Sequence, residues 1–391
     1  MIEVNVKALS EGLKIAGNSI VRRSHMPVLS HILIEGEASP HTRLKIFATN
    51  LTEYMEVSVP AAGKGAAIRA VVSFADLDRI TKAAGKGVEF LTLSPENGLT
   101  VNVGRGSYPL KTRSAADFPT FPRIKDNFAL WAAGDWIDRA PYTRALSALL
   151  PAVSTDEMRR SLTGVCFNGK NKQIAATDGH RLHFTDWDFC RLAKISENYI
   201  LPMESVKSVL ALLKLESDGV FLAFETVEAA GNETPWLGVE YLGKTAVNAA
   251  LTVRCQDADF PDYPQVIPRT TKHRVTVSAA ELAESLNRMS KLALADNVRG
   301  GKVAKFCFNG DLEIRGLRDS VETITSSGDV HKAVEMGFNA SYWQDVLKAA
   351  GKECDALDIA FTGHKNPVRV TPHGVGFEAV IMPMELDRQT R

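Results

Sequence analysis

The sequence of 391 residues has no excess of charge of either sign, because 46 basic residues balance 46 acidic ones. Binding of nucleic acid would therefore depend on the local arrangement of basic side chains and not on bulk charge. The sequence also has no run of about 18 apolar residues, the length that a membrane-spanning helix requires. It has no basic N-terminal region followed by an apolar segment either. We therefore expect a cytoplasmic protein that does not associate with membranes.

Cysteine is scarce, and its distribution argues against disulfides. The five cysteines are widely spaced, odd in number and without a C-x-x-C pair: Cys166, Cys190, Cys255, Cys307 and Cys354. Cys166 and Cys307 lie in apolar runs, which is typical of small core side chains. This usage favours a reducing compartment with buried thiols.

Signatures of catalysis are also missing. The sequence shows no set of nucleophile, base and orienting group. The segment Gly104-Arg105-Gly106-Ser107 lacks the following helix and the Lys-Ser/Thr pair of a phosphate-binding loop, so we predict a hairpin turn there. We therefore predict that the protein is not an enzyme and binds no cofactor.

The sequence does contain an internal repeat with a period of about 130–140 residues. Val165–Gly169 (VCFNG) recurs as Phe306–Gly310 (FCFNG), Lys82–Lys86 (KAAGK) as Lys348–Lys352, and Asp117–Pro119 (DFP) as Asp259–Pro261; Ala48-Thr49-Asn50 is similar to Ala176-Thr177-Asp178. The matches keep the same internal order. They predict three units, residues 1–125, 126–270 and 271–391.

Each unit is predicted to contain two helices among short strands. The helices expected from apolar periodicity are Val6–Ala16, Phe74–Ala84, Tyr142–Val153, Ser205–Leu213, Ala279–Leu292 and Ser341–Ala350. In the first unit the expected strands are Val28–Ile34, Leu44–Phe47, Val57–Val59, Val88–Leu93, Leu99–Val103 and Tyr108–Thr112. Ser73 and Asn339 suit helix N-caps, while Gly85 and Gly351 suit helix ends. This order predicts an α+β fold with helices packed on antiparallel sheet.

Basic side chains recur on one face of these predicted helices, at spacings of three, four or seven residues. They are Lys7, Lys14, Arg79, Lys82, Lys86, Lys207, Lys214, Arg288, Lys291, Lys348 and Lys352. A solvated outer face would explain any single helix. Repetition along the chain instead favours a shared surface for phosphates without sequence specificity.

The segment Ala176–Leu182 (ATDGHRL) is predicted to be a hairpin, because Asp-Gly lies between two strand-like runs. Its polar residues also allow a second interpretation, a metal-dependent hydrolase that uses Asp178, His180, His183 and Asp186. Alternate residues of a strand point to opposite faces, so these four side chains need not converge. Metal analysis of the purified protein would distinguish the two interpretations.

These motifs together resemble the bacterial DNA sliding clamp family, the β subunit of DNA polymerase III. The resemblance runs in order through the whole chain: Arg23–Leu29, Ala115–Pro119, Ala176–Leu182, Phe260–Tyr263, Phe338–Tyr342 and Met382–Met384. The heptad Ala176–Leu182 and the Met-Pro-Met end are its specific elements. It implies three clamp domains per chain and a head-to-tail homodimer that closes into a ring around double-stranded DNA. The helices would line the hole.

The resemblance adds DNA contacts to those expected from the helix faces. The combined set is Arg23, Arg79, Lys82, Arg159, Lys207, Arg299 and Lys348. It also implies a groove that binds short apolar motifs of polymerase subunits, the clamp loader and repair proteins. Its residues here would be Leu162, Thr177, Gly179, His180, Arg181, Leu182, Pro261, Val266, Asn339, Tyr342, Val380, Met382, Pro383 and Met384. Apolar walls that include methionine adapt well to Leu and Phe side chains.

Some residues depart from the family pattern. Gln265 and Glu385 stand where a basic residue is common, Asp156 and Glu157 precede Leu162, and Asp387–Arg391 extends the chain. These changes concern partner affinity and would suit an accessory clamp. A monomeric peptide-binding scaffold is the remaining alternative, because ring closure depends on surfaces that the sequence does not reveal.

Overall fold

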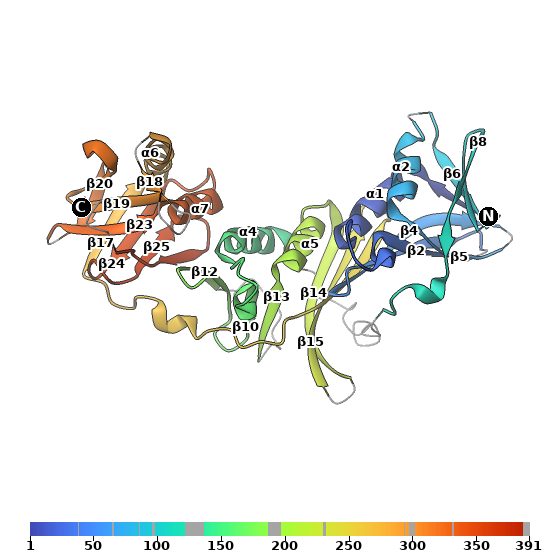
Figure 1. Ribbon diagram of the computed structural model, residues 1–391, viewed down its shortest axis with the longest axis horizontal. Coiled ribbons are helices and arrows are strands. Elements are labelled where there is room, and N and C mark those ends of the chain that lie inside the picture. The colour runs from blue at the N-terminus through green and yellow to red at the C-terminus, as the bar shows by residue number, and fades with distance from the viewer. Residues whose placement is uncertain are drawn as a thin grey trace. The chain divides into compact units, whose positions relative to one another are not determined.

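The computed structural model describes residues 1–37, 39–64, 66–85, 87–95, 98–121, 137–186, 197–229, 232–292, 294–296, 302–330 and 332–385. The chain forms two compact units, and Figure 1 labels the elements of each. The first unit comprises Met1–Arg139, Cys190–Ala193 and Glu204–Asp257; the second comprises Ala140–Phe189, Lys194–Met203 and Ala258–Arg391. No helix among the described residues is both long and apolar enough to span a membrane.

The first unit is built on a twelve-stranded antiparallel sheet. Its strands are β1 (Ile2–Asn5), β2 (His31–Gly36), β3 (Thr42–Thr49), β4 (Glu53–Gly63), β5 (Ile68–Ser73), β6 (Phe90–Ser94), β7 (Leu99–Val103), β8 (Gly106–Leu110), β9 (Thr112–Arg113), β14 (Ser217–Ala229), β15 (Asn232–Gly243) and β16 (Asn248–Arg254). The main path runs β8-β7-β6-β1-β4-β3-β2-β5-β9, and β16 joins it by pairing with β4. Strands from the first and middle repeats of the sequence therefore share one sheet.

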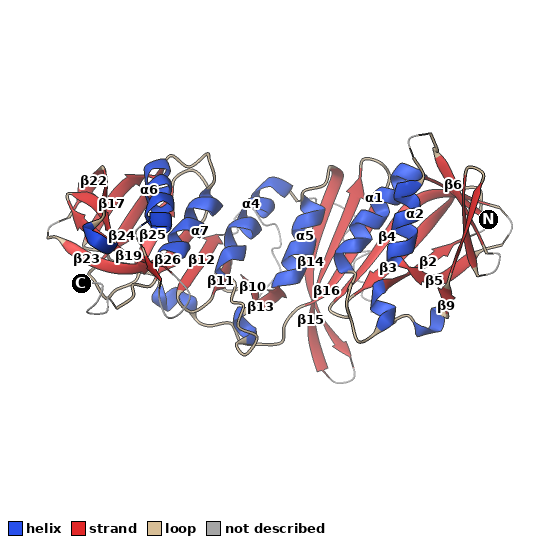
Figure 2. Ribbon diagram, turned by 45° about the horizontal axis from the view of Figure 1, so that its top comes forward, coloured by secondary structure: helices blue, strands red, loops and turns tan. Residues whose placement is uncertain are grey.

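Helices α1 (Val6–Ala16), α2 (Phe74–Ala83) and α5 (Met203–Leu213) lie side by side in this part of the chain (Figures 1 and 2). Helix α1 packs closely on the sheet at Gly12, where an added Cβ would come within 2.7 Å of a Val59 methyl group. The absence of a side chain at Gly12 thus allows the helix to approach the strand.

The second unit contains two antiparallel sheets. The nine-stranded sheet has the order β13-β10-β11-β12-β26-β25-β24-β17-β22, and in the five-stranded sheet β18-β19-β20-β21 is joined by β23. The strands are β10 (Gly164–Asn168), β11 (Gln173–Thr177), β12 (Arg181–Asp186), β13 (Asn198–Pro202), β17 (His273–Ser278), β18 (Ala295–Asp296), β19 (Lys302–Asn309), β20 (Asp311–Arg315), β21 (Val321–Ile324), β22 (Ser326–Asp329), β23 (Val334–Asn339), β24 (Ala356–Phe361), β25 (Val368–Pro372) and β26 (Glu378–Ile381). Its helices are α4 (Arg139–Leu149), α6 (Ala279–Leu292) and α7 (Ala340–Ala350).

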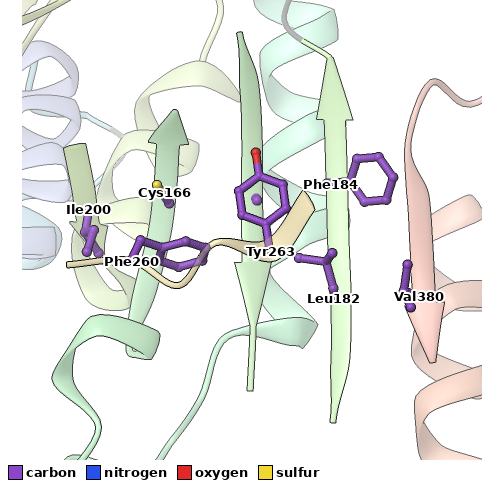
Figure 3. Close-up of a cluster of buried hydrophobic side chains, with 8 residues drawn as sticks. Cys166, Leu182, Phe184, Ile200, Phe260, Tyr263 and Val380 are labelled. Atoms are coloured by element: carbon purple, nitrogen blue, oxygen red, sulfur yellow. The ribbon is translucent and has the colours of Figure 1, made fainter. Parts of the chain in front are cut away.

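The core of the second unit joins strands that are far apart in the sequence. Cys166, Ala175, Leu182, Phe184, Ile200, Phe260, Tyr263 and Val380 form one buried cluster (Figure 3). Leu182 on β12 is the register partner of Val380 on β26, so the middle and third repeats share this sheet as well. The cluster holds the segment around Phe260 and Tyr263 against β10, β11 and β12. Leu182 and Val380 belong both to this cluster and to the predicted groove, so the cluster supports the candidate site.

The structure confirms the α+β fold and most of the predicted elements. Helices α1 and α6 have the predicted bounds, and β7 matches Leu99–Val103. The side chains of Ser73 and Asn339 accept hydrogen bonds from the first turns of α2 and α7. Gly104 has a φ of +59° in the turn between β7 and β8, as the hairpin prediction required. Four cysteines are buried free thiols, while Cys190 lies outside the described residues.

Two predicted elements differ at a proline. The strand expected over Val28–Ile34 begins only at His31, because Pro27–Ser30 forms a 3-10 turn in which proline provides the fixed φ of the first residue. The helix expected to reach Val153 ends at Leu149, and Leu150–Ala152 continues as a 3-10 turn around Pro151. Proline removes the backbone donor that a continued α-helix would need.

Glu53, the first residue of β4, is a buried carboxylate with 1% exposure. Its Oε2 accepts hydrogen bonds from Ser19 Oγ at 3.1 Å and from Ser208 Oγ on α5 at 3.0 Å. Within the described part of the chain, Glu53 Oε1 and Ser205 Oγ have no hydrogen-bond partner. Desolvation raises the pKa of Glu53 above its ordinary value of 4.5, although hydrogen bonds from the serines oppose the shift.

We expect Glu53 to make unfolding depend on pH. Since its pKa is higher in the folded protein, its contribution to stability is fully present below the unfolded pKa and is lost as the pH rises through the folded pKa. Glu53→Gln should flatten this dependence and stabilise the protein at neutral pH, because an amide carries no charge and can donate to Ser205. Chemical denaturation between mildly acidic and neutral pH measures this. Glu3→Gln, at an exposed position on β1, is the control, and equal pH profiles for both variants would contradict the prediction.

Candidate partner groove and nucleic-acid interface

The segment between β11 and β12 is a tight turn organised by Asp178. Its Oδ1 accepts hydrogen bonds from the backbone N–H groups of His180 at 2.9 Å and Arg181 at 3.0 Å. Thr177 Oγ1 donates to the Arg181 carbonyl at 2.6 Å and accepts from Gly179 N at 3.1 Å. Gly179 has a φ of +88°, a conformation that favours glycine. The predicted Asp-Gly hairpin is confirmed, and its side chains cap their own backbone.

Arg181 leaves this turn and connects three elements of the second unit. Its Nε donates to Asp178 Oδ2 at 3.1 Å, one terminal nitrogen donates to Asp345 on α7, and the other donates to the carbonyl oxygen of Pro151. The guanidinium also lies over the ring of Tyr342, 4.5 Å from its centre. Only 10% of the side chain is exposed. Arg181 therefore positions the turn against α7 and has few donors left for a bound peptide.

The turn is also connected to the C-terminal segment. The backbone N–H of Met382 donates to the His180 carbonyl at 2.9 Å, and that of Met384 donates to the Gly337 carbonyl at 2.8 Å. Gly337 belongs to β23, which leads directly into α7. The contacts therefore form a closed circuit from the turn through α7 and β23 to Met384 and back.

The residues expected to line the groove all lie in the second unit, and they divide by exposure into three groups. Leu162, Thr177, Leu182 and Val380 are buried and form part of the supporting structure. Gly179, His180, Pro261, Val266 and Met382 are exposed. The exposed fractions of Val266 and Met382 are 44% and 36%, which leaves apolar surface for a partner. Asn339, Tyr342, Pro383 and Met384 are half-buried beside them. We expect the exposed group to contact a partner and the buried group to shape the surface.

The four residues of the hydrolase interpretation do not converge. Asp178 caps the turn, and Asp186 accepts a hydrogen bond from Gln173 at 2.8 Å. His183 is fully buried, with Nδ1 at 2.7 Å from the Ala148 carbonyl, and burial lowers its pKa to about 4. No cluster of three or more acidic, histidine or cysteine side chains suited to a metal ion occurs among the described residues. The geometry thus offers the hydrolase interpretation no ligand set.

The Thr177–Arg181 turn has a counterpart in the first repeat. Between β3 and β4, Thr49 Oγ1 donates to the Glu53 carbonyl at 2.6 Å, and Asn50 Oδ1 accepts from Glu53 N at 2.7 Å. Leu51 has a φ of +73° at the place that Gly179 occupies. Glu53 therefore corresponds to Arg181. The similarity between 48–50 and 176–178, seen in the sequence, reflects one turn built twice.

The partners of these two charged side chains also correspond. Glu53 contacts Ser208 on α5, and Arg181 contacts Asp345 on α7. Both partners are the sixth residue of the second helix of the following repeat. The same position thus connects the first repeat to the middle one and the middle repeat to the third. Asp345 was not among the predicted site residues, and the repeat alignment is the signal that could have found it.

The cations expected to contact DNA lie mostly on exposed helix surface, and many are paired with carboxylates. The pairs are Arg79–Asp76 at 3.5 Å, Lys82–Asp78 at 2.7 Å, Arg159–Asp156 at 3.1 Å and Lys207–Glu204 at 2.7 Å. Arg23 and Lys348 are exposed. Arg299 lies outside the described residues. The spacing of three or four residues could have predicted these pairs from the sequence.

A depression of about 770 Å³ lies between α1, α2 and α5 in the first unit. Lys7, Lys14 and Lys82 line it together with Glu11. The Glu11 carboxylate accepts a hydrogen bond from Thr245 at 2.8 Å. Three lysines at one concave surface suit an extended anion such as a phosphate backbone.

Comparison with solved structures identifies this fold. The chain has the fold of solved beta sliding clamps: it matches that of Caulobacter crescentus with a TM-score of 0.80, 23% identity and 98% and 99% of the two chains covered. It matches the Pseudomonas aeruginosa DNA polymerase III subunit beta with a TM-score of 0.78 and 22% identity, over 99% of this chain and 100% of the other. The chain thus has the fold of one class of proteins, the DNA clamps.

Sequence comparison identifies the family within that class. Residues 264–385 match the family model of the DNA polymerase III beta subunit, C-terminal domain. The Rickettsia felis beta sliding clamp is 24% identical, with 98% of this chain and 99% of the relative covered. The Caulobacter vibrioides protein is 26% identical, with 97% and 98% covered. The sequence comparisons thus confirm the resemblance stated from the motifs: the chain is similar to bacterial beta sliding clamps over nearly its whole length, and residues 264–385 match their C-terminal domain.

We expect that even the conservative substitution Arg181→Lys lowers the stability of the second unit. Arg181→Lys keeps the charge but loses the fork that reaches Asp345 and Pro151 and the flat group over Tyr342, so unfolding should cost about 1–3 kcal/mol less. Chemical denaturation monitored by tryptophan fluorescence measures the loss. Arg315→Lys, at a more exposed ion pair with Glu313, is the matched control and should change stability by less than about 1 kcal/mol. A similar loss in both variants would contradict the role assigned to Arg181.

Proposed function

We propose that the protein is a sliding clamp: two chains form a closed ring around double-stranded DNA and tether polymerase subunits to it, without catalysis. The observation that supports this most strongly is agreement in fold and sequence with beta sliding clamps over nearly the whole length of both chains. The repeated helices with exposed basic side chains suit the phosphate backbone, since such contacts carry no sequence information.

The three-domain division, 1–125, 126–270 and 271–391, is part of this proposal. The order of two helices and intervening strands recurs three times along the chain. The middle repeat contributes β14–β16 to the first unit and β10–β13 to the second. Its two sets of strands pair with β4 of the first repeat and β26 of the third, so a split into two compact units is compatible with three domains.

Internal symmetry indicates how a second copy would continue the ring. At both junctions within the chain, the last strand of one repeat pairs with a strand of the repeat before it, β16 with β4 and β26 with β12. In each case that earlier strand directly follows the repeated turn, Thr49–Glu53 before β4 and Thr177–Arg181 before β12. The corresponding strands with a free edge are β8 in the first repeat and β21 in the third, each at the end of its sheet order. Tyr108 on β8 and Val321 on β21 are 47% and 50% exposed. We propose that β21 of one copy pairs with β8 of the other, which gives a head-to-tail dimer.

The exposed group of groove residues suits short motifs with Leu or Phe anchors. Met382 and Val266 would contact the anchors, and the circuit through Arg181 would hold the surface in shape. The partners we propose are polymerase subunits, the clamp loader and repair proteins, in the cytoplasm. A monomeric scaffold with the same groove remains the second candidate, because the groove residues all lie within one unit.

Comparing retention of the protein on circular and on linear DNA tests the proposed function. Loaded onto nicked circular duplex by a bacterial clamp loader, the protein should stay on the circle and leave when a nuclease linearises it. Reversing Arg79, Lys82, Lys207 and Lys348 together to Glu should weaken loading and retention strongly and in a salt-dependent way, while Lys82→Glu alone should have a modest effect. Fluorescence of the labelled protein on bead-bound DNA measures retention. Equal retention on circular and linear DNA would contradict encirclement, and a fully retained quadruple variant would contradict the helix surface.

The groove should bind isolated peptides weakly, near micromolar, because each buried Leu or Phe gives roughly 1.5–3 kcal/mol less the cost of ordering the peptide. Met382→Ala with Met384→Ala should cost about 1–3 kcal/mol of binding while the assembly stays intact. Peptides with acidic flanks should bind worse than neutral or basic ones, since Gln265 and Glu385 replace common basic residues. Glu385→Arg should reverse this preference, more so at low salt.

Fluorescence-polarisation titrations of one anchor peptide with acidic, neutral and basic flanks measure both effects. Met26→Ala changes an exposed methionine in the other unit and serves as control. Equal affinity for all three flanks would contradict the electrostatic part. No binding of any peptide, with retention on DNA intact, would mean that this surface is not the partner site.

A further inference from the structure

Two lysines occupy the same place in the first and third repeats but have different neighbours. Lys82 on α2 and Lys348 on α7 are the first residues of the repeated segment KAAGK. Four residues earlier, one turn away on the helix, stands Asp78 in α2 and Gln344 in α7. The chain therefore contains its own comparison of one lysine with and without a carboxylate partner.

The contacts differ accordingly. Lys82 Nζ donates to Asp78 Oδ2 at 2.7 Å, and its side chain is 67% exposed. Lys348 is also exposed, and within the described residues no carboxylate lies at ion-pair distance from it. Asp345, three residues before Lys348, is engaged by Arg181. Among the described residues, Lys348 thus presents an ammonium group without a carboxylate partner, whereas Asp78 balances the charge of Lys82.

We infer that the residue four positions before this lysine sets how strongly the first and third repeats hold DNA, and that Asp78 is the residue that weakens the hold of the first repeat. This inference rests on the proposed function. A phosphate that approaches Lys82 must replace Asp78 and lies close to a second negative charge. At Lys348 it meets a cation beside a neutral amide. In the middle repeat a carboxylate also pairs with a helix lysine, but at a different spacing: Glu204, three residues before Lys207, accepts from it at 2.7 Å.

The physical consequence is a ring with a small number of phosphate contacts. On duplex DNA each neutralised phosphate contributes about 0.9 to the slope of log affinity against log salt. Ion-paired lysines release fewer counterions on binding, because their charge is already balanced by the protein. A balanced surface therefore lowers both the affinity and its salt dependence, and a ring with this surface moves along DNA with less resistance.

The test exchanges the two neighbours. Asp78→Gln gives the first repeat the arrangement of the third, and Gln344→Asp does the reverse. Equilibrium binding of the full-length protein to a fluorescent duplex is measured by anisotropy between about 50 and 200 mM salt. If both copies of a ring gain a contact, the slope should increase by about 1.8, so the loss of affinity over this fourfold salt range should be roughly tenfold larger for Asp78→Gln. Gln344→Asp should make it roughly tenfold smaller, and the double variant should resemble the parent.

Glu35→Gln is the matched control. It also removes one carboxylate from a 2.7 Å ion pair, but Glu35 pairs with Arg69 across strands β2 and β5. It changes net charge by the same amount as Asp78→Gln and should leave the slope unchanged. Equal slopes for the parent, Asp78→Gln and Gln344→Asp would overturn the inference while leaving the clamp function standing. A shift of equal size in Glu35→Gln would overturn it too, because net charge would then be the cause. Salt-independent binding by the parent would contradict the proposed function itself.

Discussion

A buried charged side chain connects the first repeat to the middle one, and another connects the middle repeat to the third. Each is the first residue of the strand that follows the repeated turn. In the first unit this side chain is Glu53, held by Ser19 and by Ser208 of α5; in the second it is Arg181, held by Asp178, Asp345 and Pro151. Both are almost fully buried, so the loss of a partner would leave an uncompensated charge or an unpaired donor in the interior. The angle between neighbouring repeats is therefore constrained at one point, next to shared sheets.

This constraint also bears on the proposed partner groove. The turn at Asp178, helix α7, strand β23 and the Met382–Met384 segment are all positioned by one circuit of hydrogen bonds. The proposed partner surface would consequently be an ordered edge made from two repeats. Arg181 supports that surface and is largely turned away from solvent, although the family resemblance had assigned it to the groove wall.

Local rules in the sequence predicted much of the fold. Periodicity gave α1 and α6, N-cap residues gave the starts of α2 and α7, and Asp-Gly gave the hairpin before Arg181, because each depends on a few neighbouring residues. The contacts of Arg181 with Asp345, 164 residues away, were not predicted, because no local pattern encodes them and only the repeat alignment points to Asp345. Pairing of β12 with β26 and of β4 with β16 is non-local in the same way. The charge of the helix surface was overestimated, since Lys82 was considered without Asp78.

We propose that two copies of this chain repeat, between molecules, the junction that the chain builds twice within itself. Electron microscopy of the purified protein, combined with its mass in solution, tests this assembly. We expect particles of two chains that form closed rings with an open centre wide enough for duplex DNA. Single chains at micromolar concentration, or pairs that leave the ring open, would contradict it.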